Sequence, residues 1–301
     1  MTALTLAKKF FAIIFAAFLC IGISGNNQSF KTLDSDNVKL NVSVFSDVHM
    51  EGNCKPRRDF FIQCLDGLKN SEDKIDALAL VGDNTMNGQN IENMFFYGLL
   101  SNCSPVSTYL PAVGNHDVGN GEGDFSQLSA RCVEYFQAFV SRDITKPYYS
   151  RIINGYYLIM MGPDASESNS RVISDEQLDW LETAIDEAAK TGLPIFVFNH
   201  HPTTSIVQGR ERFTQLITKH PNTFLFVGHM HYYIHFTTKY GEYNTPEIWV
   251  PCLTNTGEDF SANSMTGLGY QLEVYSDKVC LRGRNYYTGN WTDVQKTYSL
   301  Y

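Results

Sequence analysis

The sequence predicts an α/β protein whose central sheet is largely parallel. Short apolar segments that suit strands cover residues 38–46, 77–81 and 108–113. Between them, residues 57–68 and 91–100 carry apolar side chains at the spacing of a helix. Strands that alternate with helices indicate βαβ units, which join parallel strands. The segment 77–81 is apolar throughout, so we expect it to be buried on both faces of the sheet.

The second half of the sequence repeats this alternation. The clearest helix begins after Ser174, which forms a capping box with Gln177, and Gly192 suits its end. Asn154 and Gly155 are the pair favoured in the type I′ turn of a β-hairpin. The strands that we expect here cover residues 148–153, 156–161, 195–198 and 224–227, followed by several antiparallel strands within 234–287.

The N-terminal segment reads differently from the rest. Lys8 and Lys9 precede an apolar run over residues 10–23, and Ser24 and Gly25 follow. A positive start, a short apolar run and small residues at its end are typical of a secretory signal peptide. The run is short for a membrane span, although an uncleaved signal anchor is the alternative. We therefore expect a secreted or extracytoplasmic protein, anchored in a membrane through residues 10–23 if the signal stays.

The remaining chain, residues 26–301, is predicted to be one domain, because no repeat or Pro/Ser-rich linker follows residue 29. The formal net charge of the whole chain, −9, argues against a general nucleic-acid surface, since phosphate backbones require clustered Lys and Arg. An anionic substrate must therefore be attracted by something other than the overall charge, and bound metal cations would do so. The oligomeric state stays open.

Six cysteines lie beyond the signal segment. Their even number permits disulfides in an exported protein, but the sequence cannot choose among 15 possible pairings. No C-x-x-C pair is present, which argues against a zinc site made of thiolates. They are Cys54, Cys64, Cys103, Cys132, Cys252 and Cys280.

Five short polar clusters, each after an apolar segment, carry the functional information. They contain Asp, Asn and His, which are the ligands that suit Mn, Fe or Zn. Singly, each has an ordinary structural explanation, such as a turn, a helix cap or a hydrogen-bonded histidine. The clusters are Asp47-Val48-His49, Gly82-Asp83-Asn84, Gly114-Asn115-His116-Asp117, Asn199-His200-His201-Pro202 and Gly228-His229-Met230-His231.

Ligands of α/β proteins bind where loops leave the carboxyl ends of the strands, and all five clusters are expected there. If the strands are neighbours, the clusters bring several imidazoles, two carboxylates and an amide oxygen to one edge. That number of side chains is too large for one four-coordinate metal and about right for two metals that share a bridging ligand.

In this order the patterns D-x-H, G-D, G-N-H-D, H-x-P and G-H-x-H resemble those of the calcineurin-like metallophosphoesterase family. The resemblance covers nearly the whole predicted domain. It implies a four-layer αββα sandwich, an α/β fold of two mixed β-sheets flanked by helices, with two divalent metal ions at the sheet edge. It implies that Asp47, His49 and His231 hold one metal, that Asn115, His200 and His229 hold the other, and that Asp83 bridges them.

The same resemblance assigns the other polar residues of the clusters. His200 rather than His201 is the ligand, because the family pattern places His two positions before Pro202. His116 would protonate the leaving group, and Asp117 would orient His116 and favour its charged form. Purple acid phosphatases have a Tyr at the position of Met86 and lack His49, so the chain is not expected to be of that subtype.

The sequence thus predicts an exported dinuclear metal-dependent phosphoesterase that attacks a phosphomonoester or phosphodiester with a metal-bound hydroxide. One alternative is a catalytically silent protein that binds metal or phosphate on the same scaffold. Another is a metal-assisted hydrolase of a non-phosphate ester or amide, which the absence of H-E-x-x-H and G-x-S-x-G motifs disfavours. Lys55, Arg57 and Arg58 either contact a phosphate or lie at a solvated helix start.

Overall fold

The structure is a computed structural model that describes residues 3–17, 29–165, 169–231, 234–239, 244–254 and 266–301. Two six-stranded sheets dominate it. The first has the order β14-β13-β12-β1-β2-β3, with β1, β2 and β3 parallel and the other neighbours antiparallel. Its strands are β1 (Leu40–Phe45), β2 (Ala77–Val81), β3 (Tyr109–Ala112), β12 (Leu268–Val274), β13 (Lys278–Asn285) and β14 (Trp291–Ser299).

The second sheet has the order β10-β11-β9-β7-β5-β4. Strands β5, β7, β9 and β11 run parallel, and antiparallel strands form its two edges. Its strands are β4 (Tyr149–Ile153), β5 (Tyr156–Met160), β7 (Ile195–Phe198), β9 (Thr223–Val227), β10 (His235–Lys239) and β11 (Thr245–Trp249). A third, two-stranded sheet pairs β6 (Arg171–Val172) with β8 (Ile206–Gln208).

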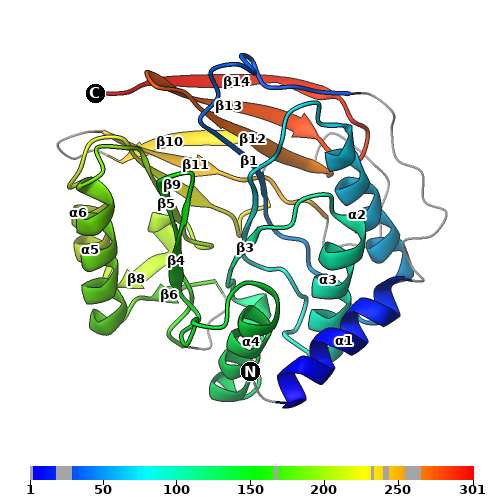
Figure 1. Cartoon of the computed structure of the whole chain (residues 1–301). Helices are drawn as coiled ribbons and strands as arrows, with labels where there is room; N and C mark the ends of the chain where they lie inside the picture. Colours follow the sequence, from blue (N-terminus) through cyan, green and yellow to red (C-terminus); the bar gives the residue numbers. More distant parts are fainter. Residues whose placement is uncertain (1–2, 18–28, 166–168, 232–233, 240–243, 255–265) are drawn as a thin grey trace.

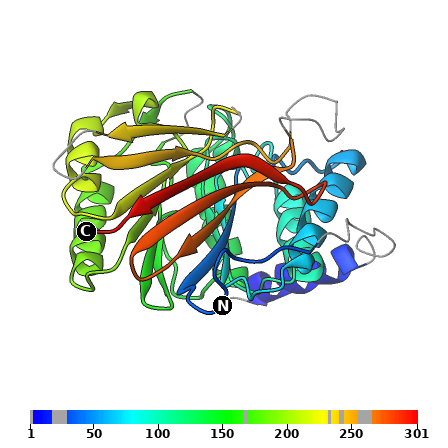
Figure 2. The same cartoon turned by 90° about the horizontal axis from the view of Figure 1, so that it is seen from above.

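Helices cover the outer faces of the two stacked sheets (Figure 1; Figure 2). Helices α5 and α6 lie on the second sheet, whereas α2 and α3 lie on the side of the first sheet (Figure 1). The predicted four-layer αββα sandwich with two mixed sheets is confirmed. The helices are α1 (Ala3–Ala17), α2 (Lys55–Gly67), α3 (Asn90–Cys103), α4 (Phe125–Phe139), α5 (Asp175–Ala189) and α6 (Arg210–Ile217), with single 3-10 turns at Leu68–Asn70, His116–Val118 and Thr203–Ser205.

The alternation of side chains along β7 explains how the sheets stack. Phe196 and Phe198 belong to the large core that also contains the first sheet, and both are fully buried. Ile195 and Val197 point the other way, into a second core with residues of α5 and α6. Successive side chains of a strand face opposite sides of a sheet, so an apolar strand can serve two cores.

The predicted capping box at the start of α5 is only half formed. The Ser174 hydroxyl accepts a hydrogen bond from the backbone N–H of Gln177, as expected. The Gln177 side chain, however, donates to Gly162 and Asp164, and the Ser174 N–H is bonded to Asp164 instead. The expectation for Gln177 is therefore wrong, because a nearby loop offers its buried amide better partners. The hairpin is confirmed, with φ of 51° at Asn154 and 89° at Gly155.

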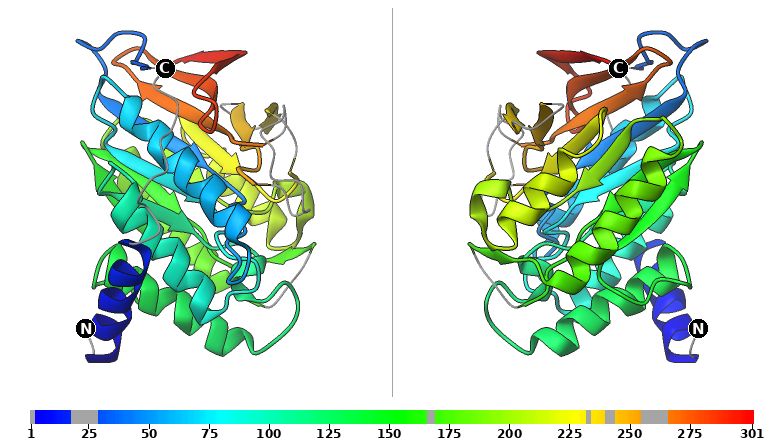
Figure 3. Two further views of the ribbon diagram at one scale, coloured as in Figure 1. Left: turned by 90° about the vertical axis from the view of Figure 1, so that its right-hand side faces the viewer. Right: turned by 90° about the vertical axis from the view of Figure 1, so that its left-hand side faces the viewer.

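The segment expected to be a signal peptide contains helix α1, which packs against α3 and α4 (Figure 3). Gly98 of α3 allows close approach, since a Cβ there would stand 2.4 Å from the carbonyl oxygen of Ala12. The Asn102 side chain donates a hydrogen bond of 2.9 Å to the carbonyl of Ile13. Among the described residues, no helix has both the length and the apolar character required to cross a membrane.

Of the six cysteines beyond the signal segment, Cys103 is disulfide-bonded and the other five keep reduced thiols. The five that form no disulfide are Cys54, Cys64, Cys132, Cys252 and Cys280.

Candidate metal centre

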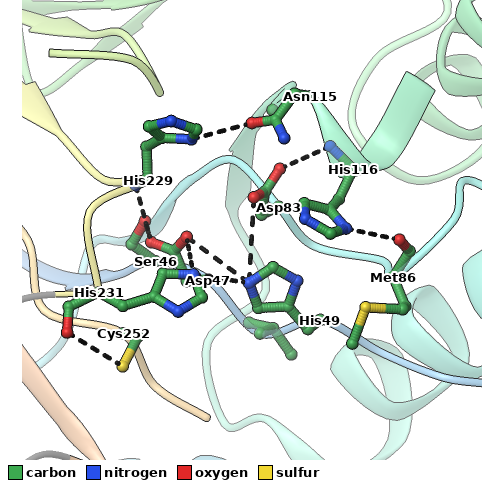
Figure 4. Close-up of polar contacts among 12 residues, drawn as sticks. Ser46, Asp47, His49, Asp83, Met86, Asn115, His116, His229, His231 and Cys252 are labelled. Atoms are coloured by element: carbon green, nitrogen blue, oxygen red, sulfur yellow. Dashed lines mark hydrogen bonds and ion pairs between the residues drawn. The ribbon is translucent and has the colours of Figure 1, made fainter. Parts of the chain in front are cut away.

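The predicted ligands lie on loops that leave the carboxyl ends of five parallel strands. The first sheet contributes four of them, after β1, β2 and β3, and the second sheet contributes three, after β7 and β9. The two sheets therefore meet at this edge through polar side chains rather than through the apolar core (Figure 4). The four are Asp47, His49, Asp83 and Asn115, and the three are His200, His229 and His231.

Four side chains form one group of potential metal ligands. Asp47, His49, Asp83 and His231 each offer a ligand atom, and these atoms lie within 4.8 Å of one another. The Nε2 atoms of His49 and His231 are 3.0 Å apart, and His231 Nε2 is 3.1 Å from Asp47 Oδ1. Imidazole and carboxylate groups that converge in this way suit a divalent transition metal.

A second group shares one residue with the first. Asp83, His200 and His229 also place ligand atoms within 4.8 Å of one another. Asp83 Oδ2 is 3.0 Å from His200 Nε2 and 3.9 Å from His49 Nε2, so this carboxylate lies between the groups. Asn115 joins the second group, because its Oδ1 atom is 3.1 Å from His229 Nδ1. The structure thus brings all seven predicted ligands together.

The glycines of the clusters allow the ligands to approach one another. A Cβ at Gly114 would stand 2.1 Å from Asp83 Oδ1, and one at Gly82 would stand 2.6 Å from His200 Nδ1. A Cβ at Gly228 would stand 2.1 Å from the Ser46 hydroxyl and 2.8 Å from Asp47 Oδ2. Any side chain at these positions would displace a predicted ligand or the residue beside it, which explains why the motifs contain glycine.

The backbone of the ligand loops is strained. Five of the predicted ligands have a left-handed backbone, which L residues rarely adopt and which costs roughly 1–3 kcal/mol for each residue. Such strain persists only where the surrounding structure holds the chain in place, and it gathers at functional sites. The five are Asp47 (φ 54°), His49 (φ 47°), Asp83 (φ 49°), His229 (φ 70°) and His231 (φ 51°).

Burial and mutual contacts perturb the protonation of these groups. Burial favours the neutral acid in Asp47 and Asp83, but neighbouring histidines outweigh it and hold the pKa of each carboxyl below its usual value. Burial opposes the charged form of His200, yet Asp83 prevails and raises its pKa to about 9. Burial, followed by the charge of His200, lowers the pKa of His229 to about 4. The carboxylates are therefore ionised and ready to bind a cation.

Two buried polar atoms show that the site fits a metal ion. Asp47 Oδ1 and His200 Nε2 are buried and make no well-aligned hydrogen bond to the described residues, and each faces another ligand group at close range, His231 Nε2 at 3.1 Å and Asp83 Oδ2 at 3.0 Å. Each belongs to one of the two ligand groups. An unsatisfied buried polar atom is costly, and coordination to a cation would satisfy both. The donor set of carboxylate, imidazole and amide oxygen suits a hard or borderline divalent ion.

His116 lies at the rim of the centre, half-buried, with its ring edge-on to that of His49 at 4.7 Å between centroids. Its Nδ1 atom is 2.7 Å from the carbonyl oxygen of Met86 (Figure 4). Because a carbonyl can only accept, Nδ1 must carry a proton, which leaves Nε2 to exchange protons. The backbone N–H of His116 donates to Asp83 Oδ1 at 2.9 Å.

Asp117 does not orient His116 in the way that the resemblance implies. Its buried carboxylate accepts hydrogen bonds from the backbone N–H groups of Gly114, Asn84 and Thr85 and from the side chains of Asn84 and Thr85. The partner of the His116 ring is instead the Met86 carbonyl. Burial, together with the charge of Asp83, raises the pKa of Asp117 to about 6. The hydrogen bonds of Asp117 therefore connect the loop that follows β2 to the loop that follows β3.

Comparison with known proteins agrees with this geometry. A model of the calcineurin-like phosphoesterase family matches residues 40–233. The chain belongs to this family. No curated protein matches the chain.

Several solved structures are similar to this chain, and one of them superposes well over most of its length. A dimetal phosphatase from Danio rerio superposes with a TM-score of 0.61 at 12% identity, over 88% of this chain and all (100%) of that one. A predicted phosphoesterase from Streptococcus pneumoniae (TM-score 0.40, 10% identity) covers 86% of this chain and 97% of its own. A Vps29 mutant from Entamoeba histolytica (TM-score 0.37, 12% identity) covers 87% of this chain and 100% of its own. At 12% identity, the similarity to the Danio rerio phosphatase concerns the fold alone.

Several residues support the centre of this calcineurin-like phosphoesterase without belonging to its motifs. The Ser46 hydroxyl donates to Asp47 Oδ2, which leaves Oδ1 to face the ligand group. Thr254 donates through its N–H to the carbonyl of Asp47 and through its hydroxyl to that of Val48. Sequence reasoning missed both residues, because their role depends on contacts between distant segments. Ser46 could have been suspected only from its place before Asp47.

The remaining polar candidates of this family member have structural partners. His201 is not in either ligand group, and its ring packs on that of His229 at 4.3 Å between centroids. Lys55 is exposed and paired with Asp59 on the surface of α2. Arg57 and Arg58 donate to backbone carbonyls of the loop that follows β1.

Proposed function

We propose that the protein is a dinuclear metal-dependent phosphoesterase that hydrolyses phosphomonoester or phosphodiester bonds of a small-molecule substrate. The observation that carries this proposal is the position of Asp83, which belongs to both ligand groups. A shared carboxylate lets two cations lie close together, because it neutralises part of their mutual repulsion. We assign Asp47, His49 and His231 to one ion and Asn115, His200 and His229 to the other.

Two bound divalent ions of Mn, Fe or Zn would clamp the phosphate, neutralise its charge and lower the pKa of a water molecule that attacks phosphorus. The protein supplies the remaining proton transfer through His116. Its Nδ1 proton is held by Met86, so Nε2 is the atom that gives a proton to the departing oxygen. Asp117 keeps the loop of His116 in register with the loop of Asp83 through its hydrogen bonds.

The second candidate is a silent protein that binds metal or phosphate and performs no hydrolysis. The half-buried ring of His116 disfavours it, because a binder needs no proton donor beside the ligand groups. Such a donor instead suits an enzyme whose leaving group would otherwise depart as an alkoxide and, with the proton from His116, departs as an alcohol.

Turnover of aryl phosphate esters tests the proposal directly. We expect the purified protein with Mn²⁺ to hydrolyse an aryl phosphate or a bis-aryl phosphate, and Asp83→Ala to abolish this activity. The matched control is Asp59→Ala, which removes a surface carboxylate paired with Lys55. Chelation of the metal should stop hydrolysis, and its return should restore it. Two bound metals without turnover on either compound would favour the silent binder.

The role of His116 has its own test. We expect His116→Ala to lose about 100-fold or more in rate on esters with poor leaving groups and much less on activated aryl esters. The reason is that a good leaving group departs without a proton. Equal losses on both kinds of ester would contradict the assignment of His116 as the general acid.

We also propose that the protein is exported, either with residues 1–25 removed or with residues 10–23 as an anchor. Lys8 and Lys9 followed by the apolar run support this proposal. The first residue of the protein recovered from its native source decides between the possibilities. A mature chain that begins near residue 26 indicates cleavage, and an intact chain extracted only with detergent indicates an anchor. An intact chain that is free in the cytosol would contradict export.

A further inference from the structure

Each backbone carbonyl from Asp47 to Met50 accepts a hydrogen bond, and one of the donors is charged. The carbonyl oxygens of Asp47 and Val48 accept hydrogen bonds from Thr254, and that of Met50 accepts one from the Met86 N–H. The carbonyl of His49 accepts from the Arg57 guanidinium, with 3.1 Å between Nη1 and the oxygen. Bonds from an ionised donor are stronger than those between neutral groups.

Arg57 is placed by helix α2 rather than by the loop itself. It lies in the first turn of α2 and is only 2% exposed. The guanidinium lies between two acceptors, with Nη1 on the His49 carbonyl and Nη2 4.0 Å from the Glu51 carboxylate, which defines its direction. Its bond to His49 therefore ties a strained residue (φ 47°) to a rigid helix. On the other side, the His49 N–H donates to the Asp83 carbonyl at 2.8 Å.

We propose that Arg57 is a positioning residue, which holds the His49 imidazole at the metal position shared with Asp47 and His231. This inference rests on the proposed function, because it assumes that these side chains bind a metal. The guanidinium fixes the peptide group that follows His49, and the direction of the ring depends on that peptide. Residues that orient metal ligands commonly contribute about 10- to 100-fold to metal affinity.

The neighbouring Arg58 provides a matched control. Its guanidinium donates to the carbonyl of Gly52 at 2.8 Å and lies 4.4 Å from the centroid of the Phe95 ring. Arg58 thus holds the same loop but bonds to no predicted ligand residue. A general effect of losing an arginine from α2 should appear equally in both variants.

Titration of the metal-depleted protein with Mn²⁺ alone tests the proposal. We expect Arg57→Ala to bind Mn²⁺ about 10- to 100-fold more weakly at the position of Asp47, His49 and His231. Its Mn²⁺ affinity at the other position should equal that of the unmodified protein. Arg58→Ala should bind both ions normally. A general loss of stability would weaken both positions together, so the unequal loss separates positioning from folding.

Electron paramagnetic resonance of the Mn²⁺-loaded protein gives a second measure. The spins of two Mn²⁺ ions about 4 Å apart are coupled, which changes the spectrum. At Mn²⁺ concentrations that give the coupled spectrum in the unmodified protein, Arg57→Ala should still give the spectrum of uncoupled ions. If Arg57→Ala does not fold, Arg57→Lys retains the charge without the fork of donors and should show the same unequal loss.

Two results would overturn the inference without contradicting the proposed function. Equal Mn²⁺ affinities of Arg57→Ala and the unmodified protein at both positions would remove Arg57 from this role and leave the proposed function intact. An equal loss in Arg58→Ala would show that the effect is general. Failure of the unmodified protein to bind Mn²⁺ would instead contradict the proposed function, and the inference with it.

Discussion

Gly114 shows how a single residue without a side chain shapes the candidate centre. A Cβ at this position would stand 2.1 Å from Asp83 Oδ1 and 2.4 Å from the Asp83 nitrogen. Asp83 is the ligand common to both groups, so a methyl group at Gly114 would move the residue on which both metal positions depend. No small rearrangement relieves the contact, because one of the two atoms belongs to the backbone.

We expect Gly114→Ala to lower kcat/KM for an aryl phosphate ester by about 100-fold or more, since a displacement of about 1 Å at a reacting centre has that effect. Steady-state kinetics at saturating Mn²⁺ measures it. Gly192→Ala is the control, because a Cβ there meets nothing within 4 Å. Its left-handed backbone (φ 67°) should cost about 1 kcal/mol of stability with normal turnover. Normal kinetics in Gly114→Ala would contradict this account of the motif.

The sequence predicts the convergence of the ligands but not the residues that hold them. The order of the motifs and their places after apolar segments suffice to bring seven side chains to one edge. The partners of Asp117 and His116 could not be predicted, because they depend on how two loops from neighbouring strands fold against each other. Arg57 likewise gives no sign in the sequence that its side chain is buried.

Among the elements, most of those with a clear apolar pattern are predicted well, and most of the missed ones lack such a pattern. Strands β2 and β7 match their predicted bounds, and both are fully buried. Strand β14 at a sheet edge is largely exposed, and α6 has only eight residues, so neither produces a clear apolar pattern. Helix α4 is also missed, although it has a readable signal: Asp124 caps it, and its apolar residues recur at helical spacing.

For the molecule as a whole, metal binding should contribute to stability. Asp47 and Asp83 are buried at 0% and 1% exposure beside each other, and cations would neutralise their charges. A ligand that binds only the folded state adds about 2.7 kcal/mol to the free energy of unfolding when its free concentration is 100 times its dissociation constant. We expect Mn²⁺ to raise, and a chelator to lower, the urea midpoint at constant pH. Asp83→Ala should show a smaller difference, and identical midpoints with and without Mn²⁺ in the unmodified protein would refute the expectation.

The division of the ligands between two sheets has a consequence for the order of folding. Asp47 and His231 are far apart in the sequence. Strand β12 (Leu268–Val274), which pairs with β1, lies even farther along the chain. Contacts between such distant segments form slowly, because long loops must close first. High-affinity binding of metal by both ligand groups therefore requires that the two sheets have already packed against each other. Release of a bound chromophoric metal would mark the first separation of the sheets during unfolding.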